Sequence, residues 1–231
     1  MSRLSGRPEG SASAPPPGGG EPSRLGAAVW ICAVQFFVMQ AVVQSAWTTP
    51  FSLRDNFISD LGNTACGPYP AGSASYVCSP WHAAMNLSFF VQGWIILVGG
   101  ALLWRAFPPE RLRALGMALL ATAGPGLMLV GLYAENENLP PHKLGAGLQF
   151  VLGNLGIALL GVLLARRGGK PLLGAFSVLC GLVGVVATGL LVTDRFLGLG
   201  VGGMERFAAY PLPLWLMAVG WSFLRRGSAV P

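Results

Sequence analysis

Charged side chains are scarce in this chain of 231 residues. Asp, Glu, Lys and Arg together make up 10% of it, whereas soluble domains carry about 25%. Hydrophobic residues make up 53%, so the composition excludes an ordinary soluble protein and places the chain in the membrane class. The net charge of +6 does not indicate a nucleic-acid partner, because the basic residues stand in short clusters beside apolar runs and form no phosphate-binding stripe.

Histidine and cysteine are also rare, with two and four copies. Two histidines cannot build a site of three helix-borne histidines, and the four cysteines form no pair of Cys-x-x-Cys motifs for zinc. A nucleotide-binding motif is missing too, because the glycine-rich stretch LGLGVGG at 197–203 has no strand–turn–helix context and is expected to be a flexible loop. The motifs alone therefore predict no cofactor.

Long apolar runs are what the sequence does contain. A membrane-spanning helix needs about 20 apolar residues to cross about 30 Å of hydrocarbon. No Asp, Glu, Lys, Arg or His lies deep inside the runs, as the cost of about 2.5–3.5 kcal/mol for a charge at a helix centre requires. The sequence predicts an all-α polytopic membrane protein, a bundle of six transmembrane helices over 25–47, 81–104, 114–133, 144–165, 172–193 and 207–224.

The two ends of the chain differ from this membrane domain. Residues 1–24 are rich in Ser, Pro, Gly and Ala, cannot bury a core, and are expected to form a disordered cytoplasmic tail. A signal peptide is the competing interpretation, but the apolar run that follows is too long for one and further runs come after it. We therefore expect a six-span domain over 25–224 and a short cytoplasmic tail over 225–231.

The basic residues predict the orientation. Positive residues stay cytoplasmic, and with six spans the basic clusters all fall on the side of both termini. The abundance of Ala and Gly and the preference for Arg over Lys suggest a bacterial genome, hence the bacterial plasma membrane. The cytoplasmic side holds Arg3, Arg7, Arg24, Arg105, Arg111, Arg113, Arg166, Arg167, Lys170, Arg225 and Arg226, and the outer side holds Arg54, Lys143, Arg195 and Arg206.

Most acidic residues and both histidines fall on the opposite, outer side. One interpretation is that these acids are only what the positive-inside rule leaves there, with each histidine bonded to a loop carbonyl. The hypothesis we prefer is a shallow polar pocket open to the outside, because the rule does not explain why the histidines join the acids. The candidate residues are Arg54, Asp55, Asp60, His82, Asn86, Glu135, His142, Asp194, Glu205 and Arg206.

Both histidines stand near expected helix starts. Ser79 can cap a helix, and Pro80 suits its first position. His82 and Asn86 are then four residues apart on one face. Two prolines also precede His142, in the stretch LPPHKLGAGLQF, and Gln149 lies two helical turns deeper on the same side.

Two cysteines, Cys66 and Cys78, share the first outer loop. The oxidising side of the membrane favours a disulfide between them. Two free thiols are the alternative.

Four stretches resemble a known family: FSLRDNFISDLGN, WHAAMN, HKLGA after the acid-rich connection, and GGMERFAAYPLPLW. They are similar to a bacterial six-span membrane family catalogued as domain of unknown function 998. The resemblance covers the chain from the first span to the sixth. It implies a compact six-helix bundle with functional residues on its outer rim, and it implies no particular reaction.

Three functions remain open. The first is a non-enzymatic protein that binds membrane lipids, a small ligand, a partner protein or a second copy of itself at the outer rim. The second is a metal-dependent lipid hydrolase, with zinc held by His82, His142 and a carboxylate such as Glu135. The third is a small transporter, for which midplane ionisable residues are missing. A single site would bring Asp60, His82, Glu135 and His142 within about 10 Å.

Overall fold

The computed structural model describes residues 20–70 and 75–226. Six helices in these ranges are long and apolar enough to cross a membrane, which confirms the predicted all-α, multi-pass architecture. Most boundaries agree with the prediction within a few residues. The fourth and sixth spans are exceptions, because they begin earlier than expected, at Leu139 and Gly200. The observed spans are Arg24–Ser45, His82–Ala106, Arg111–Leu132, Leu139–Arg166, Pro171–Val192 and Gly200–Arg225.

Several spans consist of more than one helical segment. The first three spans contain α1 (Arg24–Ile31), η1 (Cys32–Val34), α2 (Gln35–Ser45), α3 (His82–Leu103), η3 (Trp104–Ala106) and α4 (Arg111–Leu132). The last three contain α5 (Leu139–Gly147), the π-helical η4 (Leu148–Gly153), α6 (Asn154–Arg166), α7 (Pro171–Val192), α8 (Gly200–Ala209) and α9 (Pro211–Arg226). The first loop holds η2 (Ser59–Gly62), β1 (Gly67–Pro68) and β2 (Tyr76–Val77).

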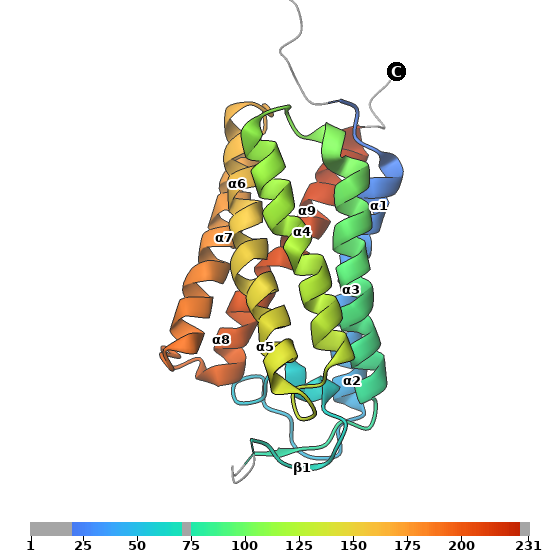
Figure 1. Ribbon diagram of the computed structural model, residues 1–231, viewed down its shortest axis with the longest axis vertical. Coiled ribbons are helices and arrows are strands. Elements are labelled where there is room, and N and C mark those ends of the chain that lie inside the picture. Colours follow the sequence, from blue (N-terminus) through green and yellow to red (C-terminus); the bar gives the residue numbers. More distant parts are fainter. Residues whose placement is uncertain (1–19, 71–74, 227–231) are drawn as a thin grey trace, which may run out of the picture.

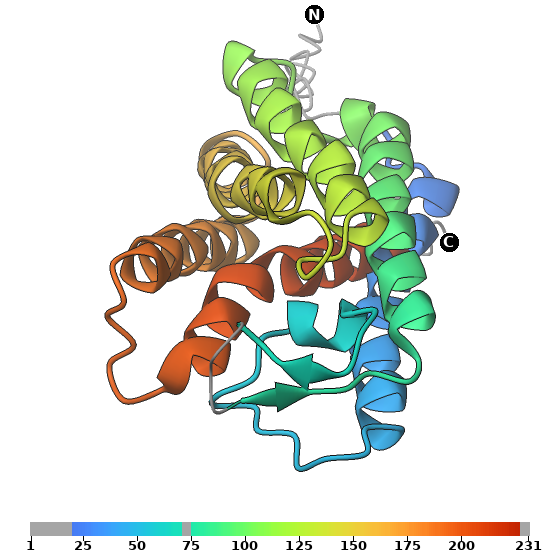
Figure 2. The same cartoon turned by 60° about the horizontal axis from the view of Figure 1, so that its bottom comes forward.

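The six spans form a closed ring. Each span packs on the next, and α9 packs back against α1. The described chain begins and ends at the same end of the bundle (Figure 1). The opposite end holds the described parts of the first loop, 46–70 and 75–81, and the loops 133–138 and 193–199, and we call it the acidic end. There η2 and the β1–β2 hairpin lie across the mouth of the bundle, beside α2 and α8 (Figure 2). The expected tails over 1–24 and 225–231 lie almost wholly outside the described residues.

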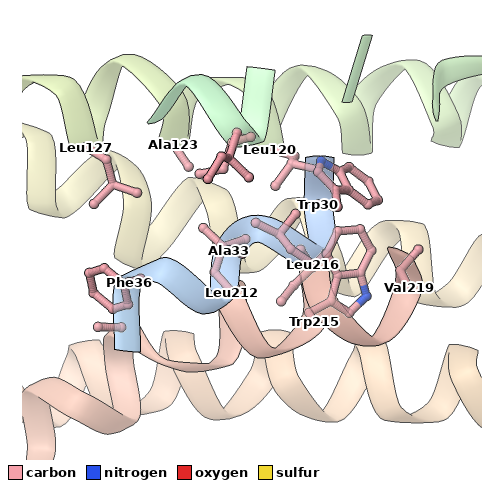
Figure 3. Close-up of a cluster of buried hydrophobic side chains, with 14 of the residues drawn as sticks. Trp30, Ala33, Phe36, Leu120, Ala123, Leu127, Leu212, Trp215, Leu216 and Val219 are labelled. Carbon is pink, nitrogen blue, oxygen red and sulfur yellow. The ribbon is translucent and has the colours of Figure 1, made fainter. Parts of the chain in front are cut away.

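The core of the bundle lies where α1 meets α9. Trp30 and Trp215 are both fully buried, and their ring centroids are 5.2 Å apart. Leu120 and Leu216 pack around them (Figure 3). The sixth span is the most buried of the six, and its helix α9 packs against α1, α6 and α7.

The sixth span is broken between α8 and α9. Pro213 has no N–H, so the carbonyl of Ala209 loses its helical partner. Two buried amides from the fourth span donate to the broken region: Gln149 Nε2 to the Ala209 oxygen at 3.2 Å, and Asn154 Nδ2 to the Ala208 oxygen at 3.0 Å. These amides join helices, as polar groups in apolar surroundings must find partners.

Replacing Asn154 with alanine should lower the free energy of unfolding by about 1–3 kcal/mol, because the Ala208 carbonyl would lose a buried donor. The melting temperature in detergent should fall by about 5 °C for a chain of this size. The exposed neighbour Leu155 provides the control, and Leu155→Ala should leave the melting temperature almost unchanged. Equal melting temperatures for the two variants would show that the Asn154 amide does not support the broken helix.

Candidate functional site

The first loop is held onto the acidic end by side chains of several elements. Asn86 Nδ2 on α3 donates to the Gly62 carbonyl at 2.9 Å, and Thr64 Oγ1 donates to Glu137 at 2.7 Å. The Ser79 hydroxyl donates to the Leu61 carbonyl at 2.7 Å. The predicted helix cap by Ser79 is therefore wrong: α3 begins at His82 without a side-chain cap.

A disulfide closes the outer part of this loop. Cys66 and Cys78 are bonded, as predicted, and the short β1–β2 pairing lies between them in the chain. The loop 46–81 is thus tied together at its outer part and hydrogen-bonded to α3 and to the α4–α5 connection.

Three acidic residues from distant parts of the chain meet beneath this loop. Asp60 comes from η2, Glu135 from the α4–α5 connection, and Glu205 from α8. Their exposed fractions are only 3%, 8% and 6%. The predicted shallow pocket open to the outside is therefore wrong for these residues, because the folded loop covers them.

The acidic side chains bond mainly to the loop. Asp60 Oδ2 accepts from the Phe57 N–H at 2.9 Å and from Asn56 Nδ2 at 3.1 Å. Glu135 Oε2 accepts from the Ser59 hydroxyl at 2.9 Å. The carboxyl groups of Asp60 and Glu135 also lie close enough to interact with each other.

On α8, Glu205 and Arg206 hold the loop from below. Glu205 accepts from the backbone N–H of Ile58 at the start of η2, a position that favours an anion. Arg206 Nη1 donates to the carbonyls of Leu53 at 3.1 Å and Asn56 at 2.8 Å. The predicted flexible loop over 197–203 is wrong in part, because its second half begins α8 and supports these contacts.

Burial raises the pKa of Glu135 well above its usual range, and the nearby charge of Asp60 raises it further. Burial also raises the pKa of Asp60, while bonds from Glu135 and Asn56 and the charge of Arg206 oppose this rise. Tyr69, which lies beside both carboxyls, has its pKa raised to about 12, first by burial and then by their charges.

The two histidines occupy different surroundings. His142 Nδ1 bonds to the Tyr133 carbonyl at 2.8 Å, which confirms the alternative interpretation for this residue. The same ring lines a small enclosed cavity of about 30 Å³ together with Gln149 and Glu205. His82 and Asn86 instead line a more open hollow of about 450 Å³ between α3 and α4.

The structure thus brings together only part of the predicted set. Asp60, Glu135, Glu205 and Arg206 form one buried cluster, and His142 borders it through the small cavity. The remaining candidates lie elsewhere at the acidic end of the described chain. Arg54 and Asp55 are paired and exposed at the surface, Asp194 lies on an exposed turn, and His82 and Asn86 line their own hollow.

A metal centre gains no support from this arrangement. Across 20–70 and 75–226, no group of three or more His, Cys, Asp or Glu side chains is placed to hold a metal ion. His82, His142 and Glu135 contact different partners. The described residues therefore offer no ligand set for the zinc hypothesis.

Sequence reasoning missed several members of the cluster. Asn56 and Ser59 hold the carboxyl groups of Asp60 and Glu135, and the Tyr69 hydroxyl donates to the Glu135 carbonyl at 3.2 Å. The four-residue spacing between Asn56 and Asp60 was the one available signal, because it allows a side-chain contact in a helical turn. Tyr69 carried no such signal.

An apolar groove lies beside the cluster. Its volume is about 600 Å³, and it runs between α7 and the broken sixth span. Apart from the two arginines Arg54 and Arg206, apolar side chains dominate its lining; Leu53, Leu179, Val183, Phe207 and Leu214 are among them.

Comparison with known proteins places the chain in a family. No curated protein and no solved structure matches it. The family model described as "Protein of unknown function (DUF998)" matches residues 31–222, which include the second to fifth spans, most of the first and sixth spans, and the buried cluster. This chain is therefore a member of the DUF998 family.

Proposed function

We propose that this protein binds an anionic membrane lipid in the groove between α7 and the broken sixth span. In this proposal the protein lies in the bacterial plasma membrane, with the acidic end outside and both termini in the cytoplasm. The orientation rests on the basic connections at the other end of the bundle. The observation that carries the proposal is an apolar groove with a buried arginine in its wall.

The groove has the size and lining of a ligand site. Small-molecule pockets commonly measure about 300–1,000 Å³ and combine apolar walls with a few polar groups. The groove volume of about 600 Å³ falls in this range. Its walls belong to spans that would stand in the bilayer, where an acyl chain is the most abundant apolar partner. Leu179 and Leu214 are exposed along it.

Two arginines supply the polar part. Arg206 is 8% exposed, and its Nε has no hydrogen-bond partner among the described residues. A buried donor without a partner costs about 1–3 kcal/mol, and a phosphate or carboxylate oxygen of the lipid would remove this cost. Arg54 lies at the surface next to it, where an arginine can pair with an anionic head group.

A bulky substitution inside the groove should displace the lipid. Leu179 and Leu182 are both exposed leucines on α7, three residues apart, and only Leu179 lines the groove. Leu179→Trp should reduce the lipid that copurifies with the protein, measured by mass spectrometry, by about tenfold, equivalent to about 1.4 kcal/mol of binding. Leu182→Trp should retain the wild-type amount.

The head group is tested separately. Arg54→Gln should shift the bound lipid from anionic toward zwitterionic species without unfolding the protein, because exposed ion pairs contribute little to stability. Equal lipid content in Leu179→Trp, Leu182→Trp and wild type would show that the groove is not the binding site. An unchanged ratio of anionic to zwitterionic lipid in Arg54→Gln would remove the proposed role of this arginine.

A further inference from the structure

Two buried carboxyl groups lie close together in the cluster. Asp60 and Glu135 are within hydrogen-bonding and electrostatic range of one another, and because ionised carboxylates are acceptors only, a bond between them requires a proton. We infer that Asp60 and Glu135 together form a proton-binding site, and that the one proton they share fastens the first loop to the α4–α5 connection. This inference does not depend on the ligand of the groove.

One oxygen of each carboxyl group already accepts hydrogen bonds from the first loop. Asp60 Oδ2 accepts from the Phe57 N–H and from the Asn56 amide, and Glu135 Oε2 accepts from the Ser59 hydroxyl. The remaining oxygens, Asp60 Oδ1 and Glu135 Oε1, are buried and have no donor among the residues that the structure describes. Two neighbouring buried acceptors that lack a donor would both be satisfied by one hydrogen between them.

The surroundings decide which residue holds the proton. Asp60 accepts from a backbone N–H and from an amide and lies within electrostatic range of Arg206, and all three interactions favour its ionised form. Glu135 receives one hydroxyl and faces the negative charge of Asp60. The proton therefore belongs mainly to Glu135, whose O–H donates to the Asp60 carboxylate.

The other titratable and charged groups near the pair come from three elements. The hairpin supplies Tyr69, which stays neutral, and α8 supplies Glu205 and Arg206, which carry opposite charges when ionised. The α5 helix supplies His142, whose ring bonds to the Tyr133 carbonyl. None of these residues donates to the two unpaired oxygens, so none replaces the shared proton.

Loss of the proton should loosen the loop. Two adjacent buried negative charges repel each other, and one lies on the loop while the other lies on the bundle. The pKa of Glu135 in the folded protein lies well above its ordinary value of 4.5, so the stability from the proton is complete below that value and falls as the pH rises toward the folded-state pKa. In this window, loop opening should increase up to about tenfold per pH unit.

Infrared spectroscopy in deuterium oxide tests whether the proton is present. The wild-type protein at pH 7 should show a protonated-carboxyl band to which the Asp60–Glu135 pair contributes one proton. Glu135→Gln and Asp60→Asn should each lower the band intensity by that contribution, because the new amide donates the hydrogen that the proton had supplied. No band in the wild type would overturn the inference. An undiminished band in Asp60→Asn would also overturn it, because the proton would then belong to Glu135 alone.

Limited trypsin cleavage after Arg54 tests the effect on the loop. The Arg54 carbonyl accepts from the N–H groups of Gly202 and Gly203, so cleavage there requires the loop to open. Cleavage should accelerate with pH in the wild type and in the control Glu137→Gln, and it should lose this acceleration in Glu135→Gln. An acceleration that is equal in all three proteins would overturn the inference. So would a cleavage rate that follows sodium concentration, because a cation would then occupy the site.

Discussion

Replacement of Arg206 with methionine should lower the free energy of unfolding by about 3–5 kcal/mol. The Arg206 guanidinium joins α8 to the first loop through two hydrogen bonds, to the carbonyls of Leu53 and Asn56. Hydrogen bonds to charged groups contribute about 1.5–3 kcal/mol each. Methionine fills a similar space and supplies no donor, and it also removes the positive charge that lies near Glu205 and Asp60.

The matched control is Arg54→Met, because Arg54 also lines the groove but lies at the surface. Its side chain is 68% exposed and pairs with an exposed aspartate at 3.7 Å, and such pairs contribute at most about 1 kcal/mol. Thermal unfolding in detergent and unfolding by a denaturing detergent should both separate the two variants. Arg206→Lys should lie between them, since lysine restores the charge without the planar fork of donors.

A second readout shows where the loss of stability occurs. Without Arg206, the first loop should be held to the bundle mainly by Glu135 and Glu205. These contacts are weaker, so the first loop should open before the helices separate. In Arg206→Met, proteolysis of the loop should therefore increase at temperatures at which the helical circular-dichroism signal is unchanged. A variant that melts like the wild type and resists proteolysis would show that the arginine is not what holds the loop.

The transmembrane architecture was predictable from the sequence because each span is determined locally. About 20 consecutive apolar residues suffice to identify a spanning helix, and the first, second, third and fifth spans were located within a few residues. The disulfide between Cys66 and Cys78 was also predictable, because both cysteines lie in one loop. Neither inference required knowledge of which helices touch.

The buried cluster was not predictable in the same way, because it depends on contacts between distant parts of the chain. The apolar run alone predicts a sixth span that begins at residue 207, after Glu205 and Arg206. In the structure both residues lie in the first turns of that span. A charged pair can enter the helical region there because loop residues such as Ile58 and Asn56 bond to it. No local pattern in the sequence indicates that Glu205 and Arg206 have partners about 150 residues away.

The apolar groove escaped prediction for a related reason. It exists because α8 and α9 are separate segments, and the break between them is compensated by amides of the fourth span. The sequence indicated an irregular entry to the sixth span through Pro211 and Pro213, but it did not show that a space would remain between this span and α7. The groove remains where the surfaces of α7 and the broken sixth span do not fit closely together, and composition does not reveal such a mismatch.

Substitution of Gly202 by alanine should have the next largest effect, with a loss of about 3 kcal/mol or more. A Cβ atom at this position would lie 2.1 Å from the Asn56 carbonyl oxygen and 2.9 Å from Arg206 Nη1. Overpacking costs about 1–3 kcal/mol, and here the obstacle is backbone, which cannot rotate away. The loop would have to move outward, and the bond between Asn56 and Arg206 would be lost with it.

The adjacent Gly203 isolates this effect from helix propensity. At Gly203 the nearest atom to a new Cβ is the Leu199 Cβ at 3.1 Å, and the loop backbone is not in contact with it. Alanine favours a helix over glycine by about 1 kcal/mol, so Gly203→Ala should be neutral or stabilising, whereas Gly202→Ala should melt earlier and be cleaved faster after Arg54. Equal stability of the two variants would show that α8 and the first loop are not packed this closely. That result would also conflict with the burial of Asp60, Glu135 and Glu205, because the close contact between α8 and the first loop excludes water from these acids.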